Sequence, residues 1–213
     1  MTKLGTALLQ RLTAPLSAAG LLLGALFWAA ALTPSLIPRG GPLQGAIGGL
    51  CFAAGYAIAV AAAALWRWLG LPIVPQPLLG RLRQAAALAA AVLMLAAAFL
   101  GNGWQNDVRL ALGMPPVEAG WPIVLLVVGL LLILLMLLTG RLFAALRDLY
   151  GAPLRKLLPR RAALLVASLL AAWSFWAVGN GFLLDALLRG LAPSSRRIDA
   201  LIPAEEERPA DPL

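Results

Sequence analysis

Long apolar runs alternate with short polar segments along the whole chain. The runs lie at about residues 16–33, 44–68, 84–100, 121–138 and 162–184, and each approaches the length that a membrane-spanning helix needs. Apolar and polar positions do not alternate within them, as they would in the strands of a membrane barrel. The pattern predicts an all-α, polytopic membrane protein with about five transmembrane helices.

The composition agrees with this class. Hydrophobic residues make up 62% of the 213 positions and charged residues only 12%, whereas charged residues are about a quarter of a typical soluble domain. We therefore expect one helical transmembrane domain over residues 1–191. Residues 192–213 hold four prolines and a run of three glutamates, and this composition predicts a linker or a disordered tail.

The first apolar run has an alternative interpretation. A basic start, an apolar core and the small residues Ala29–Ala31 also fit a cleaved signal peptide. The run is longer than the usual signal core and the chain stays apolar beyond it, so we expect a retained helix.

Basic residues are distributed unevenly between the two sides that five spans would define. The loops on the side of the N-terminus carry nine Lys and Arg residues, and the loops on the other side carry two, Arg39 and Arg109. Positively charged loops stay in the cytoplasm. The sequence thus predicts a multi-pass protein of the bacterial plasma membrane with a cytoplasmic N-terminus and an extracytoplasmic C-terminus.

Few residue types that carry chemistry are present. The chain has no histidine and one cysteine, Cys51, which excludes a Ser-His-Asp triad, a Cys-His pair and a histidine-ligated metal. There is no Gly-x-Ser-x-Gly motif. We expect no catalytic residue, no cofactor and no metal. The net charge of +8 comes from arginines that flank apolar runs, so it indicates membrane lipids, and not nucleic acid, as partners.

Two features concern packing. The glycine pairs Gly20/Gly24 and Gly45/Gly49 have the four-residue spacing that lets helices approach closely, although ordinary packing would also account for them. Residues 140–161 combine basic residues with apolar ones at helical spacing, which predicts an amphipathic helix at the membrane surface.

One pattern occurs twice. Gly-Asn-Gly begins at residues 101 and 179, and an aspartate follows four residues after each second glycine. These segments could form a polar pocket on the outer side, from residues Asn102, Asn106, Asp107, Asn180 and Asp185. Alternatively, Asn-Gly ends each helix there and the aspartates lie among the headgroups.

Residues 32–39, Leu-Thr-Pro-Ser-Leu-Ile-Pro-Arg, come directly after the first run. Proline lacks a backbone N–H and disfavours helix in the residue before it, so the helix must end here, and Arg39 should mark the water boundary. Any membrane protein could have such an exit turn. The residues that we single out in this turn are Thr33, Pro34, Ser35, Pro38 and Arg39.

With further motifs, this turn resembles the N-terminal transmembrane region of a bacterial family of membrane-bound alpha/beta-hydrolases. The supporting motifs are Gln44-Gly45 with Gly55-Tyr56, Trp104-Gln105-Asn106 with Arg109, Gly113-Met114, and Leu158-Pro159-Arg160-Arg161. The resemblance covers about residues 16–200.

The resemblance implies a role beside a serine hydrolase domain. The chain would anchor an extracytoplasmic alpha/beta-hydrolase domain, in cis or in trans, and present lipid or ester substrate to it. The nucleophile elbow, the acid and the histidine of that domain are not in this sequence, so no catalytic residue can be transferred. The alternatives are a small stand-alone transporter or channel-like protein and a scaffold that binds partner helices. The substrate and the oligomeric state are not indicated.

Overall fold

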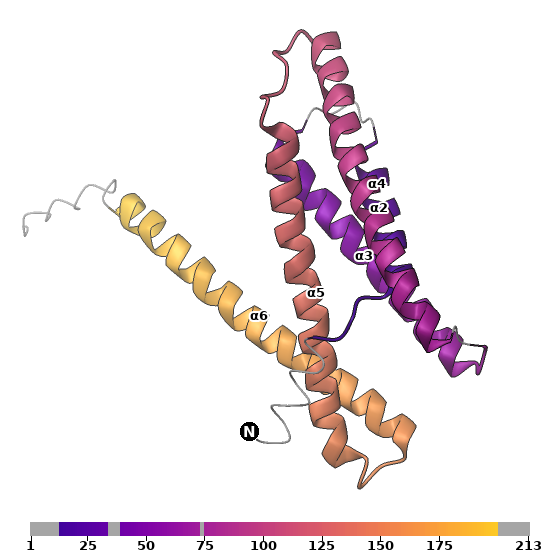
Figure 1. The fold of residues 1–213 in the computed structure, drawn as a ribbon. Helices are drawn as coiled ribbons and strands as arrows, with labels where there is room; N and C mark the ends of the chain where they lie inside the picture. The colour runs from indigo at the N-terminus through magenta and orange to yellow at the C-terminus, as the bar shows by residue number, and fades with distance from the viewer. Residues whose placement is uncertain (1–12, 34–38, 73–74, 200–213) are drawn as a thin grey trace, which may run out of the picture. The chain divides into compact units, whose positions relative to one another are not determined.

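The computed structural model describes residues 13–33, 39–72 and 75–199, and every regular element in them is an α-helix. The five helices are α2 (Ala18–Ala31), α3 (Gly41–Trp68), α4 (Gln76–Ala111), α5 (Trp121–Leu154) and α6 (Arg160–Asp199) (Figure 1). The predicted all-helical class is confirmed. The contacts divide the chain into two compact units, Met1–Leu142 and Phe143–Leu213.

Four of the five expected spans are helices long and apolar enough to cross a membrane, namely α3, α4, α5 and the Arg160–Phe182 part of α6. The first, α2, has 14 residues. At 1.5 Å per residue it extends about 21 Å, less than the roughly 30 Å of a bilayer core. Its N-terminus is set by Ser17, whose Oγ accepts a hydrogen bond from the N–H of Gly20 at 3.3 Å.

Several helices are longer than the apolar runs that predicted them. Helix α4 continues through Gly101-Asn102-Gly103, and α6 continues through Gly179-Asn180-Gly181. The interpretation that Asn-Gly ends these helices is therefore wrong. Helix α6 also extends to Asp199, eight residues into the segment interpreted as a linker, and residues 200–213 lie outside the described part.

Left-handed glycines end α3 and α4 instead. Gly70 has φ of 72° and Gly113 has φ of 68°, a region that residues with a side chain rarely adopt. After each glycine the chain turns back on the helix: the N–H of Leu71 donates to the carbonyl of Trp66, and that of Met114 to the carbonyl of Arg109. This is the common way for a glycine to end a helix.

The first unit has its core around Trp28. The indole of Trp28 is fully buried, and it packs with other buried side chains from α2, α3, α4 and α5, among them Phe52, Met94 and Leu125. Helix α2 lies against both α3 and α4 (Figure 1). The shortest of the described helices therefore packs against two longer ones.

Glycines on α3 and α5 allow the backbones to meet. A Cβ atom on Gly45 would lie 2.5 Å from the carbonyl oxygen of Leu125, and one on Gly49 would lie 2.8 Å from that of Gly129. A Cβ on Gly129 would in turn overlap the ring of Trp28. The predicted close approach at Gly45 and Gly49 is present, and its partner is Gly129.

The other predicted pair, Gly20 and Gly24, faces aromatic rings of α3. A Cβ on Gly20 would lie 2.6 Å from the ring of Tyr56, and one on Gly24 would lie 3.0 Å from that of Phe52. The Tyr56 hydroxyl also accepts a hydrogen bond from the N–H of Ser17 at 3.0 Å. Small residues on α2 thus make room for large ones on α3.

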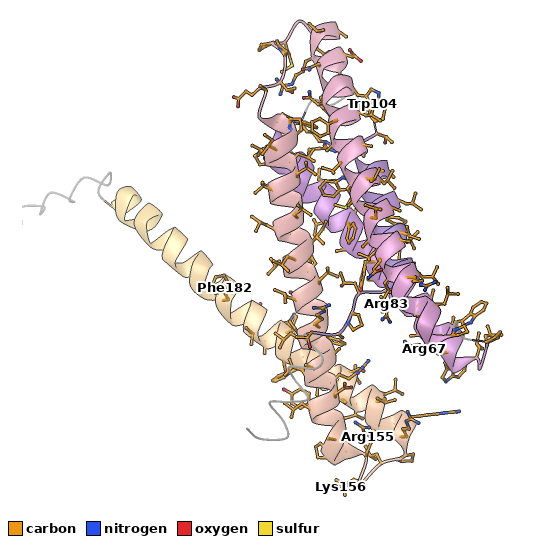
Figure 2. All side chains as sticks on the ribbon, viewed as in Figure 1. Arg67, Arg83, Trp104, Arg155, Lys156 and Phe182 are labelled. Atoms are coloured by element: carbon orange, nitrogen blue, oxygen red, sulfur yellow. The ribbon has the colours of Figure 1, made fainter. Side chains whose placement is uncertain are left out.

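The second unit joins the end of α5 to α6. Phe143 and Phe175 have ring centroids 6.1 Å apart, and the hydroxyls of Tyr150 and Ser174 lie 2.9 Å apart. Ala167 on α6 is fully buried, and a Cβ atom on Gly151 of α5 would lie 3.6 Å from its Cβ. Residues 140–154 are therefore the last turns of α5, and the separate amphipathic surface helix predicted for 140–161 is not formed. Arg155 and Lys156 lie at the turn after α5 (Figure 2).

We predict that Gly129→Ala destabilises the first unit by about 1–3 kcal/mol, because the added methyl group must displace Trp28 or the α3 backbone. Gly140→Ala, on the same helix with nothing within 4 Å of the added atom, is the matched control and should be neutral or slightly stabilising. The measurement is equilibrium unfolding in mixed detergent micelles, followed by tryptophan fluorescence. Equal unfolding midpoints would contradict the packing role of Gly129.

Candidate functional site

Polar side chains gather where α2 and α4 end and α3 and α5 begin. Arg39, just before α3, is the residue they share. Its N–H donates to Oε1 of Gln105 on α4 at 3.2 Å, and its carbonyl accepts from Nε1 of Trp121 on α5 at 3.3 Å. We call Arg39, Gln44, Gln105 and Trp121 the polar junction. Side chains of α4 and α5 thus bind the backbone of Arg39, which lies just before α3.

Gln44 connects the junction to α2. Its side chain is only 2% exposed. Its Nε2 donates to the carbonyl of Ala31 at 2.7 Å, and its Oε1 accepts from Nη1 of Arg39 at 3.4 Å. Ala31 is the last residue of α2, where carbonyls lack partners within the helix. An amide suits this position because it donates and accepts at once.

The residues of the predicted exit turn are only partly described. Thr33 donates its hydroxyl hydrogen to the carbonyl of Ala30 at 2.7 Å, which helps to end α2. Pro34, Ser35 and Pro38 lie outside the described residues. Arg39 is half-buried, with its backbone and its guanidinium group both bonded in the junction.

Three residues of the predicted polar pocket lie on α4 at this end. Asn106 is bonded to the loop after α4, since its Oδ1 accepts from the N–H of Val117 at 2.8 Å. Asn102 has a buried Oδ1 without a hydrogen-bond partner in the described part of the chain. Asp107 is exposed. Asn106 thus fixes the loop.

The other two residues lie on α6, in the second unit. Asn180 is exposed, and the side chain of Asp185 is outside the described part. A pocket shared between α4 and α6 therefore remains a prediction.

A cavity of about 570 Å³ lies beside the polar junction, within the first unit. Its walls come from the start of α3, the end of α4, the 112–120 loop and the first turn of α5. They comprise Gly40, Gly41, Pro42, Arg109, Pro115, Pro116, Val117, Glu118, Trp121 and Val124. The sequence marked Arg109 as a basic loop residue and as part of a motif, but it did not indicate this cavity, because the wall residues lie up to 84 positions apart in the chain.

The cavity has mainly apolar walls and two charged side chains. Arg109 donates from Nη1 to the carbonyl of Pro115 at 3.3 Å, while its Nε is buried without a partner among the described residues. Glu118 is exposed. No group of three His, Cys, Asp or Glu side chains that could hold a metal occurs in the described residues. The cavity thus combines apolar walls with one basic and one acidic side chain.

We predict that Gln105→Leu opens the polar junction, because it leaves the N–H of Arg39 without its acceptor at a cost of about 1–3 kcal/mol. Trypsin should then cleave after Arg39 at least about fivefold faster. The measurement is the initial cleavage rate in detergent, read by mass spectrometry. Gln84→Leu, an exposed position on α4, is the control, and equal rates for the two variants would refute the role of Gln105.

Comparison with known proteins places the chain in a family. A family model described as the alpha/beta-hydrolase family N-terminus matches residues 32–213. This range includes the polar junction and the cavity, whereas α2 precedes it. No curated protein and no solved structure matches the chain. The match covers most of the chain, and we conclude that this protein belongs to the alpha/beta-hydrolase N-terminal family.

Proposed function

We propose that this chain is a membrane-embedded domain that holds an alpha/beta-hydrolase domain at the membrane and presents lipid or ester substrate to it. The family match carries the proposal, and the apolar helices support it. The family is defined as the N-terminus of alpha/beta-hydrolases, and four helices of the chain are long and apolar enough to cross a membrane. A domain of this kind keeps an attached hydrolase domain at the bilayer surface.

The cavity at the polar junction supports the presenting role. It lies at the ends of the helices, where a bilayer would meet water, and combines apolar walls with charged side chains. Molecules with an apolar chain and a polar head occupy that same boundary. The cavity is thus suited to hold such a molecule within reach of a domain outside the membrane.

We further propose the bacterial plasma membrane, with the N-terminus in the cytoplasm and the C-terminus outside. Within the first unit, Arg67 and Arg83 lie toward the end of the helices opposite to Trp104 and the polar junction (Figure 2). Arg141 belongs to their end as well, since it binds the carbonyl of Ala14, which precedes α2, at 2.6 Å. The end that carries these arginines is the one that the positive-inside rule assigns to the cytoplasm.

The anchoring role predicts that an alpha/beta-hydrolase domain encoded with this chain sediments with membranes only when the chain is present. Hydrolysis of an ester embedded in vesicles should fall at least about tenfold without the chain, whereas hydrolysis of a water-soluble short-chain ester should not change, because only the first needs delivery from the bilayer. Full membrane association and full vesicle-ester turnover by the hydrolase domain alone would disprove the proposal.

The orientation predicts the labelling of introduced cysteines. In a Cys51→Ala background, Ser195→Cys should react with a membrane-impermeant maleimide in intact cells. Arg155→Cys, at the exposed turn after α5, should react only after permeabilisation. The measurement is the labelled fraction on a gel. The reverse pattern would invert the proposed topology.

A further inference from the structure

The cavity beside the polar junction holds one charged side chain of each sign. Arg109 comes from the end of α4, and Glu118 comes from the loop that leads to α5. Among the residues that the structure describes, no ion pair joins them. Each side chain can therefore bind the opposite charge on a ligand. The cavity thus suits a molecule that carries one positive and one negative charge.

Arg109 is placed to bind an oxyanion. Its Nη1 donates one hydrogen bond, to the carbonyl of Pro115 at 3.3 Å. Its Nε is buried and has no partner in the described part of the chain. A buried N–H without an acceptor is unfavourable, and the Nε edge of an arginine fork matches two oxygens of a phosphate. A small turn of this side chain toward the cavity would satisfy the free edge with a phosphate.

Glu118 limits which anion can enter. A ligand with only negative charge would meet repulsion from this carboxylate. A ligand that also carries an ammonium group would gain a partner instead. The pair of side chains thus favours a zwitterion over a purely anionic molecule.

The remaining walls are apolar. Pro42, Trp121 and Val124 are among them, and they belong to helices whose outer surfaces are exposed and apolar. The volume of about 570 Å³ lies within the usual range for small-molecule sites, about 300–1,000 Å³. It accommodates a headgroup and the first part of an acyl chain, with the rest of the chain lying in the bilayer.

We propose that this cavity binds a phospholipid whose headgroup carries a phosphate and a primary ammonium group. The phosphate lies at Arg109, the ammonium lies at Glu118, and the acyl chain runs along Trp121 and Val124. This inference rests on the proposed membrane location and deepens the proposed function, because it names the lipid class that the domain would hold for a hydrolase.

The test uses the full chain in dodecyl maltoside with equimolar palmitoyl-oleoyl phosphatidylethanolamine and phosphatidylglycerol. Native mass spectrometry measures which lipid the protein retains. The wild type should prefer phosphatidylethanolamine by about tenfold, Glu118→Gln should abolish this preference, and Arg109→Gln should lower retention of both lipids by about tenfold. Asp107→Asn is the control for Glu118→Gln, and Arg81→Gln is the control for Arg109→Gln. Each removes the same charge as its counterpart, from a position on α4 outside the cavity walls, and each should behave as wild type.

Val124→Trp tests the position of the acyl chain. Val124 is 40% exposed, so the larger ring should fill the cavity without disturbing the core, and retention of both lipids should fall. Glycerophosphoethanolamine, which has the headgroup without acyl chains, should compete poorly. Equal competition would show that a soluble phosphodiester is the ligand and would overturn the lipid assignment.

Three further results would overturn the proposal: no lipid preference in the wild type, an unchanged preference in Glu118→Gln, and normal retention in Val124→Trp. Glu118 is exposed, so its variant is informative even where Arg109→Gln does not fold. Lipid retention is measured on this chain alone. It can therefore succeed where the hydrolase experiment fails, and the two failures remain distinguishable.

Discussion

Burial of Trp28 is the constraint on which the first unit depends. Among the described residues, its indole is the largest side chain with no exposure, and it occupies space that glycines leave open, at Gly48 on α3 and Gly129 on α5. Lipid chains are as apolar as leucine, so in a bilayer the helices would gain little from the hydrophobic effect and would associate through close packing. One large ring surrounded by bare backbone supplies many such contacts. The short helix α2 therefore holds the longer ones together.

The polar junction supplies hydrogen-bond partners for backbone groups at the helix ends. The chain leaves one helix and enters another there, which leaves carbonyl and N–H groups without helical partners. Gln44 and Gln105 are buried and bind the carbonyl of Ala31 and the N–H of Arg39, respectively. Two side-chain amides thus replace water for these backbone groups. The family match begins at Leu32, so both glutamines lie within the matched range.

The sequence predicted the helical class because class depends on composition and on uninterrupted apolar runs. It also indicated the Gly45/Gly49 approach, since four-residue spacing is local. It did not predict that α4 passes through Gly101 and Asn102, because their helical conformation depends on tertiary contacts: Gly101 lies against Leu32, and Gln105 binds Arg39. The cavity was missed for the same reason. Arg109 and Glu118 become neighbours only once Gly113 turns the chain and Asn106 binds the loop.

The length of α2 has a consequence for the membrane itself. Helix α2 is about 21 Å long, whereas α3 and α4, which it contacts, are each longer than about 30 Å. Beside α2, the protein is therefore shorter than the hydrocarbon core of the bilayer, which is a hydrophobic mismatch. The bilayer can meet α2 by becoming thinner beside it, which costs a fraction of a kcal/mol per ångström. Lipids in a thinned region expose more of their chains to water and leave the bilayer more easily. Since Leu22 and Leu26 on α2 are exposed, this short helix would perturb the lipids next to it and favour thinner membranes over thicker ones.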